Sequence, residues 1–311
     1  MIPFVSQLTI NEQKLWLDAL GNALPNENIM LADDIPLEQR HLCRLAIVAN
    51  PNIEILSSFE NLHWLHSVWA GVEHLMTSLK SSPIEVVRLV DPMLGQTMKE
   101  AVLAWSLYLH RDMPTYAKQQ QKSYWQQLPC ISASERRIGI LGLGELGCAS
   151  VKQLQSNGFE VMGWSRSHKT VTGVKTFNGK SGLLDMVSKS DILVCLLPLT
   201  PETKGLINSE LLNSMPKGSS IINFARGAII NQDDLLTALD TTQISHAVLD
   251  VFEQEPLPPS SQLWQHGDIT VLPHISAPTN INTACGIVAK NISAYRETGQ
   301  LPQCVDKDRG Y

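Results

Sequence analysis

The sequence predicts an α/β protein made of two doubly wound parallel-sheet domains. Its 311 residues are more than one domain usually contains and suit two. In the second half of the chain, short apolar runs alternate with helical stretches, which is typical of a parallel sheet with helical connections. A Gly-x-Gly-x-x-Gly turn at Gly142–Gly147 lies between one apolar run and a helical stretch, so we expect a Rossmann-type domain there.

The strands expected in the second half are continuous apolar runs, as in strands buried on both faces of a sheet. These strands span Arg137–Leu141, Phe159–Trp164, Asp191–Leu197, Ser219–Phe224, His246–Val251 and Asp268–Leu272. The helices expected between them span Glu145–Gln155, Leu183–Ser188, Ser209–Met215 and Asp233–Leu239. Asn208 and Asn231 stand at the N-cap positions of the last two, and acidic residues follow each.

The first 98 residues carry a weaker version of the same pattern. Strands are expected at Arg44–Val48, Leu62–Trp69 and Glu85–Val90, with a helix at Glu12–Leu24. A long amphipathic stretch, Thr97–Gln121, then leads to the Gln-rich segment Gln119–Gln127, which we expect to be an exposed connection. Thr279–Thr298 is again helical and precedes a polar tail. We therefore expect one domain of residues 1–98 plus 279–311 and another of residues 99–278.

The composition excludes several classes of partner and location. A net charge of −6 argues against a nucleic acid or an anionic membrane as the main partner. No apolar run is long enough to span a bilayer, and the first residues lack the pattern of a signal peptide. The six cysteines have no metal-ligand spacing. We expect a cytoplasmic enzyme without a metal.

The glycine-rich turn predicts a dinucleotide site. Its first glycine permits the tight turn, its second lets backbone N–H groups approach a pyrophosphate, and its third lets helix and strand pack closely. The residues expected to contact the cofactor here are Gly142, Gly144, Glu145, Leu146 and Gly147.

The end of the next strand indicates which dinucleotide is bound. A site selective for NADH places an acid about 20 residues after the glycines, but no acid occurs between Val161 and Leu184. Instead, Ser165-Arg166-Ser167 and Lys169 supply hydroxyls and positive charge, which suit a 2′-phosphate. A solvated basic loop is the structural alternative. The sequence therefore favours NADPH, with NADH as the other option.

Three further strand ends carry polar residues inside apolar sequence. Ligands of a doubly wound sheet bind beyond the carboxyl ends of its strands. The three segments are Asn223-Phe-Ala-Arg226-Gly227, Leu249-Asp250-Val-Phe-Glu-Gln-Glu255-Pro256 and Leu272-Pro-His274-Ile-Ser-Ala277.

Taken in order, these motifs and Leu197-Pro-Leu-Thr-Pro-Glu-Thr203 resemble the D-isomer-specific 2-hydroxyacid dehydrogenase family. Within it, Trp-Ser-Arg after the second strand, the Pro-Leu-Pro-Pro and Leu-Trp-Gln-His segments and the Arg-Gly-Tyr ending resemble the bacterial glyoxylate/hydroxypyruvate reductase A group. The resemblance covers essentially the whole chain. It implies a flavodoxin-like substrate domain beside the Rossmann-type domain, and a homodimer.

The resemblance implies a catalytic triad of Arg226, Glu255 and His274. Arginine suits the carboxylate and ketone of a 2-oxo acid, because its planar fork can bind both. An imidazolium at His274 can donate the proton that hydride addition requires, and a carboxylate at Glu255 favours that charged form. Taken singly, Arg226 could cap a turn, Glu255 could be a loop carboxylate and His274 could be a core histidine.

The resemblance also implies further contacts with the cofactor and the substrate. Asp250 would accept a hydrogen bond from the nicotinamide amide, near backbone groups of Leu197, Pro198 and Ala225, unless it is an ordinary strand-end acid. Thr203 either contacts a phosphate or caps the following helix. The residues expected to bind the substrate carboxylate through backbone N–H groups are Ala70, Gly71 and Val72, together with Arg226 and His274.

Two positions leave the substrate's side-chain pocket undefined. Glu73 stands where the family more often has Asp, and Ala49-Asn50-Pro51 lacks the aromatic residue of close relatives. Trp69 fits either a pocket wall or a core, and Trp264 has no assigned role. The leading hypothesis is an NADPH-preferring reductase of glyoxylate or hydroxypyruvate. The alternatives are an NADH-dependent dehydrogenase of another 2-hydroxy acid and a nucleotide-sensing scaffold that binds proteins.

Overall fold

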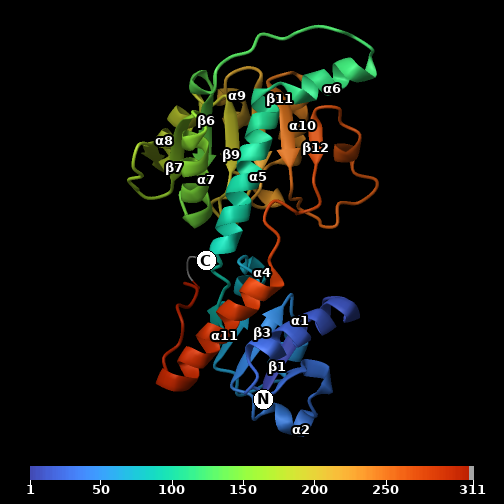
Figure 1. Cartoon of the computed structure of the whole chain (residues 1–311), viewed down its shortest axis with the longest axis vertical. Helices are drawn as coiled ribbons and strands as arrows, with labels where there is room; N and C mark the ends of the chain where they lie inside the picture. Colours follow the sequence, from blue (N-terminus) through green and yellow to red (C-terminus); the bar gives the residue numbers. More distant parts are fainter. Residues whose placement is uncertain (308–311) are drawn as a thin grey trace. The chain divides into compact units, whose positions relative to one another are not determined.

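The computed structural model describes residues 1–307, and the Arg-Gly-Tyr ending lies outside the described residues. The chain forms two compact units, Met1–Met93 with the segment from Thr279 onward, and Leu94–Pro278. The chain therefore passes from the first unit to the second after Met93, slightly before the expected boundary at residue 98. Each unit contains one parallel sheet (Figure 1), so the predicted α/β class with two parallel sheets is confirmed.

The first unit is built on a five-stranded sheet. Its strands are β1 (Ile2–Ser6), β2 (Ile29–Leu31), β3 (Leu45–Ala49), β4 (Trp64–Ser67) and β5 (Glu85–Val87), in the order β2-β1-β3-β4-β5. All four pairings are parallel, and this order is that of flavodoxin-like folds. Its helices are α1 (Ile10–Ala23), α2 (Leu37–Arg40), α3 (Ile53–Ser57), α4 (Glu73–Leu79) and α11 (Ile281–Thr298), with a 3-10 turn at Ala32–Asp34.

Two strands of this sheet were not predicted. β1 lies between β2 and β3, although it contains Pro3, and proline usually argues against a central strand. β2 is a three-residue edge strand with half-buried side chains, which gives it little apolar signal. The expected strands at Leu62–Trp69 and Glu85–Val90 exist, but the paired segments β4 and β5 are shorter.

The second unit is built on a seven-stranded sheet. Its strands are β6 (Arg137–Leu141), β7 (Glu160–Ser165), β8 (Lys175–Asn178), β9 (Ile192–Cys195), β10 (Ser219–Asn223), β11 (Ile244–Leu249) and β12 (Ile269–Val271), in the order β12-β11-β10-β9-β6-β7-β8. All six pairings are parallel. β8 was not predicted, because only Phe177 of this edge strand is buried.

Helices cover both faces of the seven-stranded sheet, which explains why its strands are continuously apolar. The helices are α5 (Pro92–His110), α6 (Met113–Gln121), α7 (Glu145–Ser156), α8 (Gly179–Val187), α9 (Ser209–Ser214) and α10 (Gln232–Asp240), with 3-10 turns at Ala133–Glu135, Gly227–Ile229 and Gln262–Trp264. One core joins α5 and α7 to alternate strand residues such as Val194 and Ile222, and the other joins α8, α9 and α10 to residues such as Leu193 and Ile221.

The long helical stretch expected at Thr97–Gln121 is two helices. α5 ends at His110, Asp112 has the left-handed conformation (φ 52°), and α6 begins at Met113 with Pro114 in its first turn. Proline is tolerated in the first turn of a helix and not in its interior, so α6 is a new helix. Among the described residues, no helix is both long and apolar enough to cross a membrane.

Candidate functional site

The predicted site residues of the second unit lie at one edge of its sheet. Gly142 follows β6, Ser165 ends β7, and the segment from Leu197 follows β9. Arg226 follows β10, Asp250 follows β11 and His274 follows β12. Because all these strands are parallel, their carboxyl ends share one edge, and the strand order reverses between β9 and β6. A doubly wound sheet binds its ligands at such a point.

The glycine-rich turn connects β6 to α7 as a dinucleotide site requires. Gly142 has φ 103°, a conformation that favours glycine. A Cβ on Gly147 would lie 1.8 Å from the carbonyl oxygen of Gly142, so only glycine allows α7 this close to the strand. No side chain caps α7 at Gly144, which leaves the N–H groups of its first turn for an anion.

The turn after β7 is held by side-chain bonds to the backbone. The hydroxyl of Ser165 donates to the carbonyl of Ser167 at 2.8 Å. The ammonium of Lys169 donates to the carbonyl of Leu143, inside the glycine-rich turn, also at 2.8 Å. The guanidinium of Arg166 lies near Glu202, whose pKa is lowered first by a hydrogen bond with Thr200 and also by this positive charge. Cationic side chains therefore lie beside the glycine-rich turn.

Thr203 closes the loop after β9 and does not cap a helix. Its hydroxyl donates to the carbonyl of Pro198 at 2.7 Å and accepts the N–H of Thr200 at 2.8 Å. The next helix, α9, is capped by Asn208. The capping role expected for Thr203 was therefore wrong, and its hydroxyl shapes the loop that begins at Leu197.

Arg226 sits on a turn that Asn223 braces from within the sheet. The side-chain oxygen of Asn223 accepts the N–H of Ala225 at 3.1 Å, and its Nδ2 donates to the carbonyl of Arg226 at 3.0 Å. The guanidinium Nη1 of Arg226 donates to the carbonyl of Ala225 at 2.6 Å. No side-chain bond from Arg226 caps the following 3-10 turn, so the capping alternative does not describe it.

Glu255 and His274 form a direct pair. Nδ1 of His274 lies 2.7 Å from Oε2 of Glu255, and Oε1 of the same carboxylate accepts the N–H of Phe252 at 2.9 Å. The His274 side chain is 52% exposed, so it is not a core histidine. Because Nδ1 is bonded to Glu255, Nε2 is the ring nitrogen that a ligand can reach.

The charges around this pair favour imidazolium and carboxylate. The hydrogen bond with Glu255 raises the pKa of His274, and this outweighs burial and the nearby charge of Arg226, which both lower it. Burial alone would raise the pKa of Glu255, but the hydrogen bonds from His274 and Phe252 together hold it below its usual value. The positive charge of Arg226 lowers the pKa of both groups, so the three predicted catalytic residues are close enough to interact electrostatically.

Asp250 holds the loop that carries His274. The carboxylate is buried, and its two oxygens accept the N–H groups of Ile275 at 2.7 Å and Ser276 at 2.9 Å. Its backbone carbonyl accepts the N–H of His274 at 3.0 Å. His274 has φ 56°, which non-glycine residues rarely adopt, and three consecutive N–H groups on one aspartate hold it there.

The predicted substrate-binding segment belongs to the other compact unit. Ala70, Gly71 and Val72 lie in the connection between β4 and α4, with Val72 buried in the core of that unit. Beside them, Trp69 packs edge-on against Trp16, with ring centroids 5.6 Å apart. Trp264 is half exposed, and its indole N–H donates to the carbonyl of Pro258.

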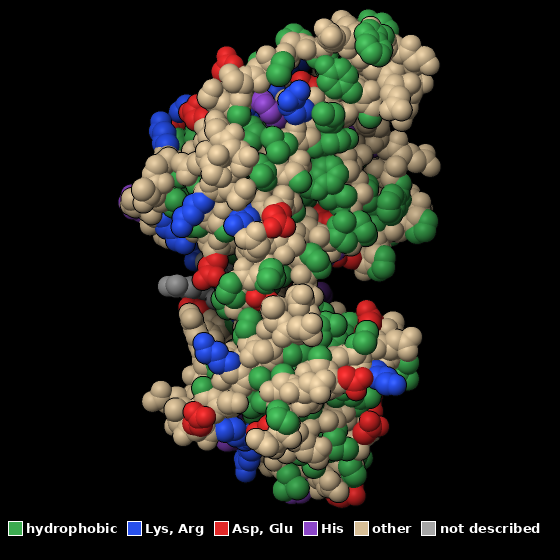
Figure 2. Space-filling view, viewed as in Figure 1, with side chains coloured by type: hydrophobic (Ala, Val, Ile, Leu, Met, Phe, Trp, Pro, Cys, Tyr) green, Lys and Arg blue, Asp and Glu red, His purple; other side chains and the backbone are tan. Residues whose placement is uncertain are grey.

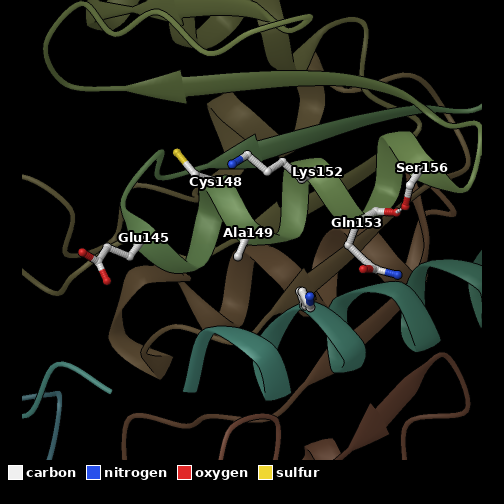
Figure 3. A pocket seen from close by; sticks show the side chains of 7 residues that line it. Glu145, Cys148, Ala149, Lys152, Gln153 and Ser156 are labelled. Carbon is white, nitrogen blue, oxygen red and sulfur yellow. Dashed lines mark hydrogen bonds between the residues drawn. The ribbon is translucent and has the colours of Figure 1, made fainter. Parts of the chain in front are cut away.

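A groove of about 480 Å³ runs along the outer side of α7 and does not include the triad. Its lining comes from α7 and from Lys99 of α5, and Figure 3 shows the α7 side chains from Glu145 to Ser156 along it. Of the predicted site residues, only Glu145 lines this groove.

Sequence reasoning missed the bracing roles of Asn223 and Asp250. Asn223 was noted only as part of a motif, and Asp250 was assigned a contact with the cofactor. The available signal was a polar side chain at the end of each buried strand. Such a side chain has to bond to nearby backbone groups when water is excluded.

Comparisons with known proteins agree with the fold of two parallel sheets. Residues 103–276 match the family model described as D-isomer specific 2-hydroxyacid dehydrogenase, NAD binding domain. A D-isomer specific 2-hydroxyacid dehydrogenase from Xanthobacter autotrophicus Py2, solved in complex with NADPH and MES, is 36% identical with a TM-score of 0.91. The match covers 100% of this chain and 99% of that chain.

Two other solved structures are similar over the full length of both chains. An NADPH-dependent glyoxylate/hydroxypyruvate reductase from Sinorhizobium meliloti, in complex with NADP and sulfate, is 32% identical with a TM-score of 0.90. A probable 2-hydroxyacid dehydrogenase from Rhizobium etli CFN 42, in complex with NADP, HEPES and L(+)-tartaric acid, is 31% identical with a TM-score of 0.90. Each match covers 100% of both chains.

Proposed function

The chain belongs to the D-isomer specific 2-hydroxyacid dehydrogenase family of NAD(P)-dependent oxidoreductases, and we propose that it is an NADPH-preferring reductase of small 2-oxo acids. The proposed reactions convert glyoxylate to glycolate and hydroxypyruvate to D-glycerate. The observation that carries the proposal is the 2.7 Å bond between His274 and Glu255, with the charge of Arg226 acting on both.

The proposed cofactor site is the edge formed by β6, β7 and β9, in the unit Leu94–Pro278. The uncapped first turn of α7 and the close approach of Gly147 suit a pyrophosphate. We assign the pyrophosphate to Gly142, Gly144, Glu145, Leu146 and Gly147, and the 2′-phosphate to Ser165, Arg166 and Ser167. The loop from Leu197 and Pro198 to Thr203, with Ala225 and Asp250, would border the nicotinamide.

NADPH is preferred over NADH in this proposal because the turn after β7 offers cations and hydroxyls. A 2′-phosphate gains charge-assisted hydrogen bonds from a guanidinium, whereas a carboxylate would repel it. The relatives from X. autotrophicus, S. meliloti and R. etli were solved with NADPH or NADP, which supports the same choice.

The triad supplies binding and proton transfer in the proposed reaction. When bound, NADPH supplies a hydride to the carbonyl carbon of the oxo acid. The guanidinium of Arg226 binds the carboxylate and polarises the ketone. Nε2–H of His274 donates the proton to the carbonyl oxygen as negative charge develops there. Glu255 keeps the imidazole oriented through Nδ1 and stabilises its charged form.

The first unit is proposed to supply the remaining donors for the substrate carboxylate. Ala70–Val72 lies in the short connection between β4 and α4, and successive backbone N–H groups in such a connection can bind an anion. Because backbone donors do not distinguish side chains, the connection fits glyoxylate and hydroxypyruvate equally well.

A homodimer is part of the proposal and rests on exposed apolar residues of the second unit. Trp125 is 94% exposed in the segment after α6, and Leu107, Met113 and Tyr124 are also exposed. Figure 2 shows hydrophobic side chains on the face of this unit that carries α5 and α6. Exposed apolar patches of this kind often mark protein interfaces. Light scattering after size-exclusion chromatography measures the state, and a monomer at micromolar concentration contradicts the dimer.

One experiment separates the proposal from its two alternatives. Oxidation of NADPH and of NADH is followed by absorbance with glyoxylate, hydroxypyruvate, pyruvate and phenylpyruvate. We expect turnover with the first two and a higher kcat/KM for NADPH. Equal use of both nucleotides would contradict the cofactor assignment and favour an NADH-type dehydrogenase. Absence of turnover with every oxo acid would favour a nucleotide-sensing scaffold.

A further inference from the structure

We propose that Asn223 is a positioning residue for Arg226, acting through the backbone of the turn that carries the arginine. The proposal rests on the proposed function, in which Arg226 binds the oxo acid. Asn223 is the last residue of β10 and is only 1% exposed, so its amide is held by the sheet and shielded from water.

The side chain of Asn223 bonds to both sides of the turn. Its oxygen accepts the N–H of Ala225 at 3.1 Å, and its Nδ2 donates to the carbonyl of Arg226 at 3.0 Å. These two contacts fix the orientation of the amide, because a flipped amide would set a donor against an N–H and an acceptor against a carbonyl. Asparagine is therefore chemically required here, since neither aspartate nor leucine offers one donor and one acceptor in the same shape.

The bracing continues from Asn223 to the guanidinium. Nη1 of Arg226 donates to the carbonyl of Ala225 at 2.6 Å. The guanidinium is therefore bonded to the same residue whose N–H donates to Asn223. On the far side, a Cβ on Gly227 would lie 2.0 Å from the backbone of Phe252, so the turn is also packed tightly against the loop that leads to Glu255. The direction of the guanidinium thus depends on a turn that is fixed at both ends.

Among the described residues, Asn223 supports the arginine and does not contact the acid–base pair through its side chain. Asn223 makes no side-chain bond with His274 or Glu255 among the described contacts, and its backbone carbonyl accepts the N–H of Asp250 at 3.1 Å whatever its side chain is. Loss of the amide therefore disturbs oxo-acid binding first, while the bond between His274 and Glu255 stays in place. A general loss of structure would also weaken NADPH binding.

The test is Asn223→Ser, which can still accept the N–H of Ala225 but cannot reach the carbonyl of Arg226. We expect KM for glyoxylate to rise about 10-fold or more, since displacing a binding group by about 1 Å can cost about 100-fold. The Kd for NADPH should not change, and the midpoint of the pH profile of kcat should stay or move upward, because the charge of Arg226 lowers the pKa of His274. Binding of oxalate, a non-reacting dicarboxylate, should weaken by the same factor in calorimetry with NADPH present.

The matched control is Asn208→Ser, which makes the same replacement at the N-cap of α9 in the same unit, where serine can also accept the N–H of Leu211. It should leave KM and oxalate binding unchanged. If Asn223→Ser does not fold, Asn223→Asp has the same shape but sets a second acceptor against the carbonyl of Arg226, and it should raise KM at least as much. An unchanged KM in whichever variant folds, or a weakened Kd for NADPH, overturns the proposal.

The failure of this proposal differs from the failure of the proposed function. A wild-type chain that turns over glyoxylate, with an Asn223→Ser variant of equal KM, removes only the positioning role. A wild-type chain without turnover removes the proposed function, and a crystal structure of Asn223→Ser then decides the positioning role. We expect the guanidinium to leave the carbonyl of Ala225, and an unmoved Arg226 overturns the proposal.

Discussion

The proposed site at the carboxyl edge of the seven-stranded sheet has two halves, one formed mainly by backbone groups and the other by side chains. After β6 the backbone forms the proposed site: the turn from Gly142 to Gly147 brings α7 against the strand and leaves its first N–H groups uncapped. After β10, β11 and β12 side chains form the proposed site. The buried polar residues Asn223 and Asp250 bond to the backbone of the segments that carry Arg226 and His274.

This difference predicts which substitutions impair each half of the proposed site. The nucleotide half, at β6 and β7, has no room for added atoms at Gly147, where a single methyl group would overlap a carbonyl. The chemical half, at β10, β11 and β12, should lose activity when atoms are removed, because each side chain depends on a bond to a partner. Additions should therefore break the first half, and deletions or charge changes should break the second.

The largest effect is expected for His274→Ala in the chemical half. Removing the proton donor should lower kcat for glyoxylate reduction about 1,000-fold, which is within the range for loss of general acid catalysis. The Kd for NADPH, measured by fluorescence, should stay the same. His266→Ala is the matched control, because His266 lies in the same unit and bonds with Asp240. Equal turnover of the His274 variant and wild type would remove His274 from the mechanism.

Gly147→Ala should give the next largest effect, in the nucleotide half. The new Cβ would lie 1.8 Å from the carbonyl oxygen of Gly142, so α7 has to move. We expect the free energy of unfolding to fall by about 3 kcal/mol, and NADPH binding to be lost. Gly144→Ala is the control, since nothing lies within 4 Å of its Cβ. Denaturant unfolding should show little loss for that variant, and equal stability of both variants with wild type would contradict the close-packing argument.

The same difference explains what could be predicted from the sequence. A glycine-rich turn between strand and helix has a fixed spacing, so the position of the Gly142–Gly147 turn was predicted, and the apolar runs placed β6, β9, β10 and β11. The bracing by Asn223 and Asp250 was not predicted, because it depends on which N–H groups the folded loops bring near. β8 and β2 were missed because edge strands with few buried residues lack a continuous apolar run.

Arg166→Gln tests the charge of the nucleotide half and should have a smaller effect. Loss of the guanidinium removes a charge-assisted hydrogen bond to the 2′-phosphate, so KM for NADPH should rise roughly 10- to 100-fold. KM for NADH should hardly change, because NADH lacks that phosphate. Lys217→Gln removes an exposed charge elsewhere in the unit and should alter neither. An equal rise for both nucleotides would show that Arg166 acts on the fold and not on the 2′-phosphate.

Glu255→Gln should give the smallest effect, and it tests how the charge of Glu255 influences His274 in the chemical half. The one oxygen of glutamine can still accept the proton of Nδ1, so the ring keeps its orientation, while the negative charge and the bond to the N–H of Phe252 are lost. That charge and hydrogen bond raise the pKa of His274, while burial and Arg226 lower it. Without the charge the pKa should fall, so less imidazolium is present near neutrality and the rate of reduction there should drop about tenfold or less.

The sign of this change follows from which form of His274 reacts. Reduction needs imidazolium, so wild-type activity should fall as pH rises through the raised pKa of His274. In the variant the same fall should come at lower pH, while oxidation of glycolate, which needs neutral imidazole, should gain at low pH. Glu253→Gln, in the same loop, should leave both pH profiles where they are. A profile for Glu255→Gln that matches wild type would mean that Glu255 orients the imidazole through Nδ1 without setting its charge.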